Sequence, residues 1–157
     1  VAEQARLFSR LPKGVRDTIA KYEARRDFAD PEYLAALDVW WRKHSCRLRI
    51  WPYEVYRLGE TRLDYVLHVP QGLMEKRLKG WDITNRLREI HAPCLIITGK
   101  YDAVTANCVK PLHQGIRGSR LIVFQDGSHL QMWEDRVRFV EIVRDFLENL
   151  SASQSRT

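Results

Sequence analysis

The sequence predicts an α/β protein in which a helical segment precedes a strand–helix–strand–helix unit. Two observations carry this prediction: the helical spacing of apolar residues over residues 1–85, and two apolar runs at 94–98 and 120–124 that each end in a polar loop. Strands and helices that alternate in this order pair in parallel through right-handed crossovers. Two strands do not bury a doubly covered sheet, so we expect its other strands to come from residues absent from this chain.

Turn signals divide the first part of the chain into short helices. A helix is predicted over 2–10, and Pro12 stands where a second helix begins that runs towards Ala24. Asp30-Pro31 is a start signal, because aspartate caps the free N–H groups of a helix and proline fits its first position. The helix that follows carries one apolar stripe at three- and four-residue steps: Tyr33, Leu37, Trp40, Trp41 and His44.

Proline and glycine set the later boundaries of the helical segment. Trp51-Pro52 ends the third helix and starts a short one towards Leu58. The stretch over 61–69 is ambiguous, and Pro70-Gln71-Gly72 breaks it.

After Trp81 the pattern changes to alternating strands and helices. Residues 82–90 are predicted as a helix or turn that Pro93 ends, and 105–114 has helical spacing. The last predicted helix, over 134–150, is amphipathic, and its predicted inner residues are Val137, Val140, Phe146 and Leu147. We therefore expect a helical domain over 1–85, an α/β part over 86–150 and a polar, frayed tail over 151–157.

Composition excludes several classes of protein. A 45% apolar and 29% charged chain is typical of a globular protein, and no run approaches the roughly 18 apolar residues of a membrane span. We find no signal peptide and expect no membrane partner. Three widely spaced cysteines (Cys46, Cys94, Cys108) form neither a disulfide framework nor a zinc pattern, which indicates a reducing compartment, and we expect the cytoplasm.

The net charge of +6 raises the question of nucleic acid. The basic residues are spread along the chain, however, and no nucleic-acid-binding signature is present, so we interpret them as a solvated face. The sequence also has no metal-ligand cluster, phosphate loop or dinucleotide fingerprint. We therefore expect no nucleic-acid partner and no cofactor.

The two strand-end loops carry an acid and a histidine, Asp102 and His129. In Ser-His-Asp chemistry the histidine takes the proton of the serine, and the acid orients the histidine. Acid before histidine is the chain order of hydrolases whose serine stands earlier, on a G-x-S-x-G turn. None of the seven serines here stands on such a turn, so the chain has no nucleophile. Two structural alternatives stay open: Asp102 as a cap for the helix at 105–114, and His129 as a packed loop residue.

Several motifs resemble one family. They are Leu11-Pro12, Asp30-Pro31-Glu32-Tyr33, Trp51-Pro52, Trp81-Asp82-Ile83-Thr84, Thr98-Gly99-Lys100-Tyr101-Asp102 and Ser128-His129-Leu130-Gln131-Met132-Trp133-Glu134. Together they make residues 11–150 similar to the C-terminal half of the proline iminopeptidases, which are α/β-hydrolases of the prolyl aminopeptidase type. The resemblance implies the C-terminal part of an α/β-hydrolase fold, with residues 1–85 as a helical cap over the active site and the N-terminal half of the sheet missing.

The same resemblance implies a serine hydrolase that releases an N-terminal residue, typically proline, from a peptide or amino-acid amide. Asp102 and His129 would be members of its catalytic triad. Because the chain opens at Val1 and has no nucleophile, we expect a fragment that is inactive alone and whose partner is the N-terminal half of the hydrolase domain. The alternatives are a non-catalytic remnant that acts as an interaction module, and a related amidase or esterase with broader specificity.

Two positions depart from the family's pattern for binding the substrate's free amine. The acid that usually follows the triad aspartate is replaced by Ala103, and an acid of the cap is replaced by Gly72. Glu75 lies nearby and is the candidate substitute. Trp40 and Trp81 are candidates for lining the substrate pocket, and for Trp40 packing in the helical core is an equal alternative.

Overall fold

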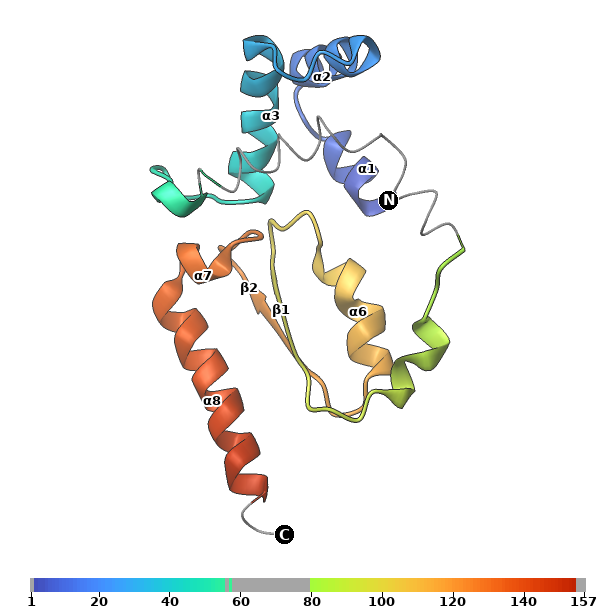
Figure 1. Cartoon of the computed structure of the whole chain (residues 1–157), viewed down its shortest axis with the longest axis vertical. Coiled ribbons are helices and arrows are strands. Elements are labelled where there is room, and N and C mark those ends of the chain that lie inside the picture. The colour runs from blue at the N-terminus through green and yellow to red at the C-terminus, as the bar shows by residue number, and fades with distance from the viewer. Residues whose placement is uncertain (1, 56, 58–79, 155–157) are drawn as a thin grey trace.

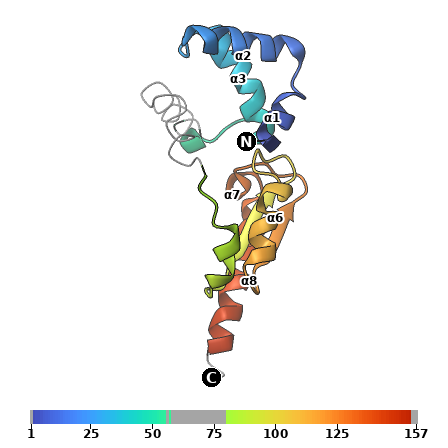
Figure 2. The same cartoon turned by 90° about the vertical axis from the view of Figure 1, so that its right-hand side faces the viewer.

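The structure, a computed structural model of the chain, describes residues 2–55, 57 and 80–154. Helices α1 (Ala2–Phe8), α2 (Lys13–Arg25) and α3 (Pro31–His44) form a helical group at one end of the molecule. The strands and the remaining helices lie at the other end (Figure 1). Figure 2 shows the same division from the side, with the helical group above the sheet. The predicted fold class is confirmed.

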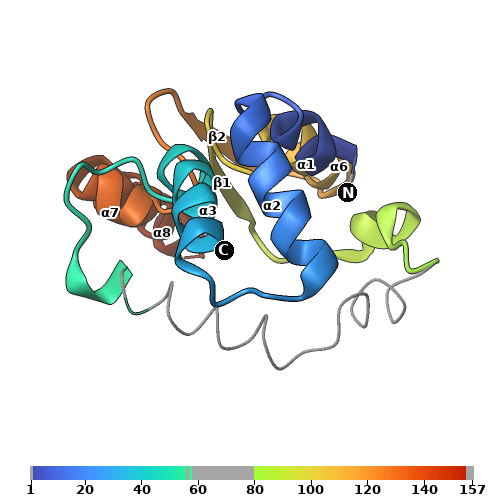
Figure 3. The same cartoon turned by 90° about the horizontal axis from the view of Figure 1, so that it is seen from above.

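The helical group has a core of its own. α2 and α3 lie side by side when seen from above (Figure 3), and α3 begins where Asp30 predicts, because this side chain accepts a hydrogen bond from the Glu32 N–H at 2.7 Å. Proline occupies the first turn, as predicted. The buried residues of this core are Leu11, Ile19, Tyr22, Phe28, Tyr33 and Ala36.

Removing the cap of α3 should weaken the helical group. We expect Asp30→Ala to lower the free energy of unfolding by about 1 kcal/mol, because the N–H of Glu32 loses its acceptor. Urea denaturation followed by circular dichroism measures the change. Asp27→Ala is the matched control, since this exposed aspartate lies just before the helix without capping it. An equal loss in both variants would contradict the assigned cap.

The sheet consists, within the described residues, of two parallel strands, β1 (Leu95–Gly99) and β2 (Arg120–Phe124). Their register pairs Leu95 with Arg120 and Gly99 with Phe124. The crossover contains α6 (Ala106–Gly115), and a 3-10 helix, η1 (Thr84–Glu89), precedes β1. In Figure 1 the strands run between α6 and α8 (Arg136–Gln154). The strands are half-buried along most of their length and buried at their C-terminal ends, which brings the following loops against the core.

The helix predicted over 134–150 is present as α8, which begins two residues later because Asp135, with a φ of −140°, separates it from the short α7 (Gln131–Glu134). The prediction of its inner face is wrong. Three predicted inner residues are exposed, by 71% for Val137, 42% for Val140 and 56% for Leu147, and only Phe146 is half-buried. The half-buried stripe is Phe139, Ile142, Val143, Phe146 and Leu150. Both stripes have helical spacing, so spacing alone does not decide which one faces the sheet.

Some predictions cannot be compared with the structure. The stretch over 61–69, the break at 70–72 and the candidate residue Glu75 lie outside the described residues. Among the helices in the described ranges, none has the length and apolar character required to cross a membrane.

Candidate active site

The loops that follow β1 and β2 bring Asp102 and His129 together. Both strands run in the same direction, so their C-terminal ends lie at one edge of the sheet. Nδ1 of His129 lies 3.1 Å from one carboxylate oxygen of Asp102 and 3.2 Å from the other. The contact predicted from the order of the strands is present.

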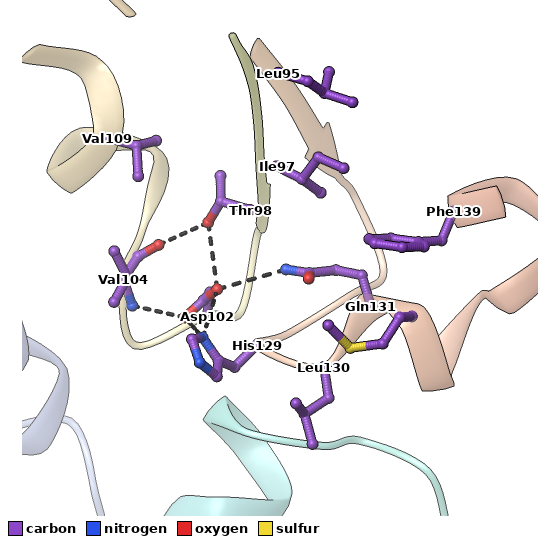
Figure 4. A pocket seen from close by; sticks show the side chains of 11 residues that line it. Leu95, Ile97, Thr98, Asp102, Val104, Val109, His129, Leu130, Gln131 and Phe139 are labelled. Carbon is purple, nitrogen blue, oxygen red and sulfur yellow. Dashed lines mark hydrogen bonds and ion pairs between the residues drawn. The ribbon is translucent and has the colours of Figure 1, made fainter. Parts of the chain in front are cut away.

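Asp102 is buried and faces several hydrogen-bond donors. It is 3% exposed, and the N–H of Val104 donates to its Oδ1 at 2.7 Å. The amide of Gln131 and the hydroxyl of Thr98 each lie 3.5 Å from Oδ2 (Figure 4). The N-cap position of α6 belongs to Thr105, so Asp102 does not cap that helix. The side chain is held inside the protein with its carboxylate aimed at His129.

His129 combines a buried partner with an exposed ring. Its side chain is 57% exposed, whereas the carboxylate beneath it is buried. A carboxylate only accepts hydrogen bonds, so Nδ1 of the neutral ring carries the proton and Nε2 is the proton acceptor. This arrangement suits a general base, because the acid fixes the tautomer that leaves Nε2 basic.

A cavity of about 370 Å³ lies beside the pair. Asp102, His129, Thr98 and Gln131 supply its polar side chains, and Figure 4 shows the first two at one end of the lining. The apolar lining residues are Leu95, Ile97, Val104, Val109, Leu130, Met132 and Phe139. A small, mainly apolar cavity with a few convergent polar groups is typical of a ligand site.

Backbone contacts join the two loops directly. The N–H of Lys100 donates to the carbonyl of Phe124 at 2.8 Å, and that of Tyr101 donates to the carbonyl of Gly127 at 3.0 Å. At the end of β1, Gly99 lies so near this loop that a Cβ there would be 2.5 Å from the carbonyl carbon of Gly127. The position of Asp102 relative to His129 therefore depends on close packing of two backbones.

Four residues around this site carry no catalytic signature in the sequence: Thr98, Gln131, Glu134 and His44. The first three fall inside the motifs quoted above, and these motifs are the signal that points to them. His44 belongs to the apolar stripe of α3, yet it is buried and its Nδ1 lies 2.7 Å from the carbonyl of Tyr101. Burial lowers the pKa of His44, which favours the neutral form of the ring beside the loop that carries Asp102.

Of the other candidate residues, the two that the structure describes, Trp40 and Trp81, do not line the cavity. The ring of Trp40 packs against Phe8 and, with a centroid distance of 4.3 Å, against His44. Trp40 is thus part of the helical core, the alternative that the sequence left open. Trp81 is exposed and is not among the lining residues.

Comparisons with known proteins identify relatives that match nearly the whole chain. The chain is 36% identical over 155 residues to a proline iminopeptidase of Saccharolobus solfataricus, covering 96% of the chain and 50% of the relative. It is 37% identical over 153 residues to a proline iminopeptidase of Thermoplasma volcanium, covering 94% of the chain and 52% of the relative. The chain therefore spans about half the length of the curated relatives it matches. No family model matches it.

Solved structures give the same picture of the fold. The crystal structure of VinJ superimposes with a TM-score of 0.81 at 29% identity, over 95% of this chain and 52% of the other. The crystal structure of a proline iminopeptidase of Mycobacterium smegmatis gives a TM-score of 0.75 at 28% identity, over 96% of this chain and 53% of the other.

Proposed function

The chain belongs to the proline iminopeptidase family of α/β-hydrolases, and on this basis we propose that the protein containing it is a serine hydrolase that releases the N-terminal residue, typically proline, from peptides or amino-acid amides. His129 is the general base and then the general acid, and Asp102 orients it. The nucleophilic serine comes from outside residues 1–157. The observation that carries the proposal is the 3.1 Å contact between these side chains at neighbouring strand ends.

Nε2 of His129 carries one proton in each half of this mechanism. Nε2 of His129 takes the proton of the serine hydroxyl as its oxygen bonds to the substrate carbonyl carbon, and Asp102 stabilises the resulting imidazolium. The imidazolium then protonates the leaving amine as the C–N bond breaks, which leaves an acyl-enzyme. A water molecule gives its proton to Nε2 and attacks the acyl carbon, and the same proton returns to the serine when the ester bond breaks.

We propose that residues 1–85 are a cap over this site, that 86–150 belong to the hydrolase domain and that 151–157 lie outside that domain; of the frayed tail predicted there, residues 151–154 instead form the end of α8. Contacts between the helical segment and the strand-end loops support the cap. The N–H of Leu130 donates to the carbonyl of Ser45 at 3.0 Å, and the hydroxyl of Thr105 donates to Glu3 at 2.9 Å. Figure 1 shows α1 and the end of α3 facing the loops that follow the strands.

Substrate choice depends on how the free amine is held. Ala103, next to Asp102, offers no charge to a substrate ammonium. Each missing charge-assisted contact weakens binding by about 1.5–3 kcal/mol. In the whole protein we expect the ratio of kcat/KM for a prolyl amide with a free amine to that for its N-acetylated form to be below about a thousandfold. Such a result favours broader amidase or esterase activity over strict iminopeptidase activity.

A larger ratio means that another acid holds the amine, and Glu75→Gln tests the first candidate. Glu89→Gln is the control, since Glu89 forms an exposed pair with Arg86. A fluorophosphonate probe should label a serine of the whole protein, and His129→Ala should abolish this labelling. The 157-residue chain alone should not be labelled. A whole protein without a reactive serine would support the alternative, a non-catalytic interaction module.

A further inference from the structure

We propose that Glu134 is a positioning residue that fixes the orientation of His129 and couples it to residues 45–47 of the helical segment. The inference rests on the proposed role of His129 as the base. In the proposed mechanism Glu134 does not contact the reacting atoms. It acts through the loop that carries His129.

The carboxylate of Glu134 accepts three hydrogen bonds, two from Ser128 in the nearby loop and one from Arg47, which is distant in the sequence. Its Oε2 accepts from the N–H of Ser128 at 2.5 Å, and its Oε1 accepts from the hydroxyl of Ser128 at 2.6 Å. The same Oε1 accepts from the N–H of Arg47 at 2.5 Å. Hydrogen bonds to an ionised acceptor are short and strong, so one side chain joins the loop before His129 to the segment that follows α3.

His129 is held on both sides by these contacts. Ser128, which precedes it, is fully buried and bound to Glu134. Leu130, which follows it, donates its N–H to the carbonyl of Ser45 at 3.0 Å. Residues 45–47 are themselves held in place, because Cys46 is fully buried and its carbonyl accepts a hydrogen bond from the indole N–H of Trp51 at 3.0 Å.

The chemistry of this position requires a carboxylate. Three donors converge on Glu134, and both of its oxygens are acceptors. A glutamine would present an NH2 group to one of these donors and leave it without an acceptor, which is costly when the donor is buried. The loop would then relax, and the ring of His129 would lose its alignment with Asp102. Contact between residues 45–47 and the loop that carries His129 therefore keeps the ring aligned with Asp102. Loss of this contact would misalign it.

The test uses Glu134→Gln in the whole protein with 15N-labelled histidine, serine and arginine. Long-range 1H–15N correlations at a pH where the ring is neutral report the tautomer of His129. In the parent protein the Nδ1–H form should dominate, because Asp102 accepts that proton. In the variant the Nε2–H form should gain, and amide exchange at Ser128 and Arg47 should accelerate together by at least about tenfold.

Two further variants make the result decisive. Glu141→Gln removes an exposed carboxylate of α8 and should change neither measurement. Ser128→Ala removes one of the three donors and should give a smaller change of the same kind if Glu134→Gln does not fold. An unchanged tautomer overturns the proposal, whether or not amide exchange changes. Because no measurement here depends on turnover, failure of the hydrolase proposal appears separately, as absence of activity in a protein whose Glu134 contacts respond as expected.

Discussion

Asp102→Asn should lower kcat of the whole protein by about 10⁴-fold with little change in KM. The N–H of Val104 donates to one oxygen of Asp102 at 2.7 Å, so an asparagine keeps its own oxygen there and turns its NH2 group towards His129. An NH2 group at the Oδ2 position, 3.2 Å from Nδ1, together with the loss of the negative charge, favours the tautomer in which Nδ1 accepts and Nε2 carries the proton. In that tautomer the nitrogen that faces the substrate is no longer basic.

Steady-state kinetics on a prolyl amide measures this effect. Asp126→Asn is the matched control, because it makes the same chemical change at an exposed position three residues before His129. Its kcat should stay within about twofold of the parent, as expected for a surface substitution. A protein that keeps more than a tenth of its kcat after Asp102→Asn does not use this pair as proposed.

Gly99→Ala should destabilise the protein by about 3 kcal/mol, a typical large cost of overpacking. The added Cβ would lie 2.5 Å from the carbonyl carbon of Gly127, and the atoms that it meets are backbone atoms that cannot rotate away. To relieve the contact, the loop that carries Asp102 must separate from the loop that carries His129. Catalytic activity should therefore fall with stability.

Urea unfolding of Gly99→Ala and Gly14→Ala separates this contact from a general effect of glycine replacement. Gly14 lies in α2, and nothing lies within 4 Å of a Cβ built there. Alanine suits a helix better than glycine, so Gly14→Ala should stabilise the protein by up to about 1 kcal/mol. Similar losses in both variants would show that the two backbones at Gly99 are not tightly packed.

Local signals in the sequence predicted the elements that depend on neighbouring residues. Asp30-Pro31 predicted the start of α3, because capping involves only the first turn of a helix. The two apolar runs predicted the strands, and their parallel order predicted that Asp102 and His129 meet. These inferences need only the geometry of one element or of two adjacent ones.

Contacts between distant segments could not be predicted in this way. The last helix has two stripes with the same spacing, and tertiary packing selects the one that contains Phe139 rather than the one that contains Val137. The bond from the N–H of Arg47 to Glu134 joins residues that are far apart in the chain, and it uses a backbone donor that every residue except proline has. Because a backbone donor does not depend on the identity of its residue, no sequence pattern indicates this contact.

The loops that carry Asp102 and His129 are tied mainly through main-chain groups, and this has an evolutionary consequence. The N–H groups of Lys100 and Tyr101 would make their bonds with almost any side chain attached. Side chains at positions 100, 101 and 103 can therefore change without misaligning Asp102. Ala103 illustrates this freedom: the side chain next to Asp102 can change while the acid and the histidine keep their places.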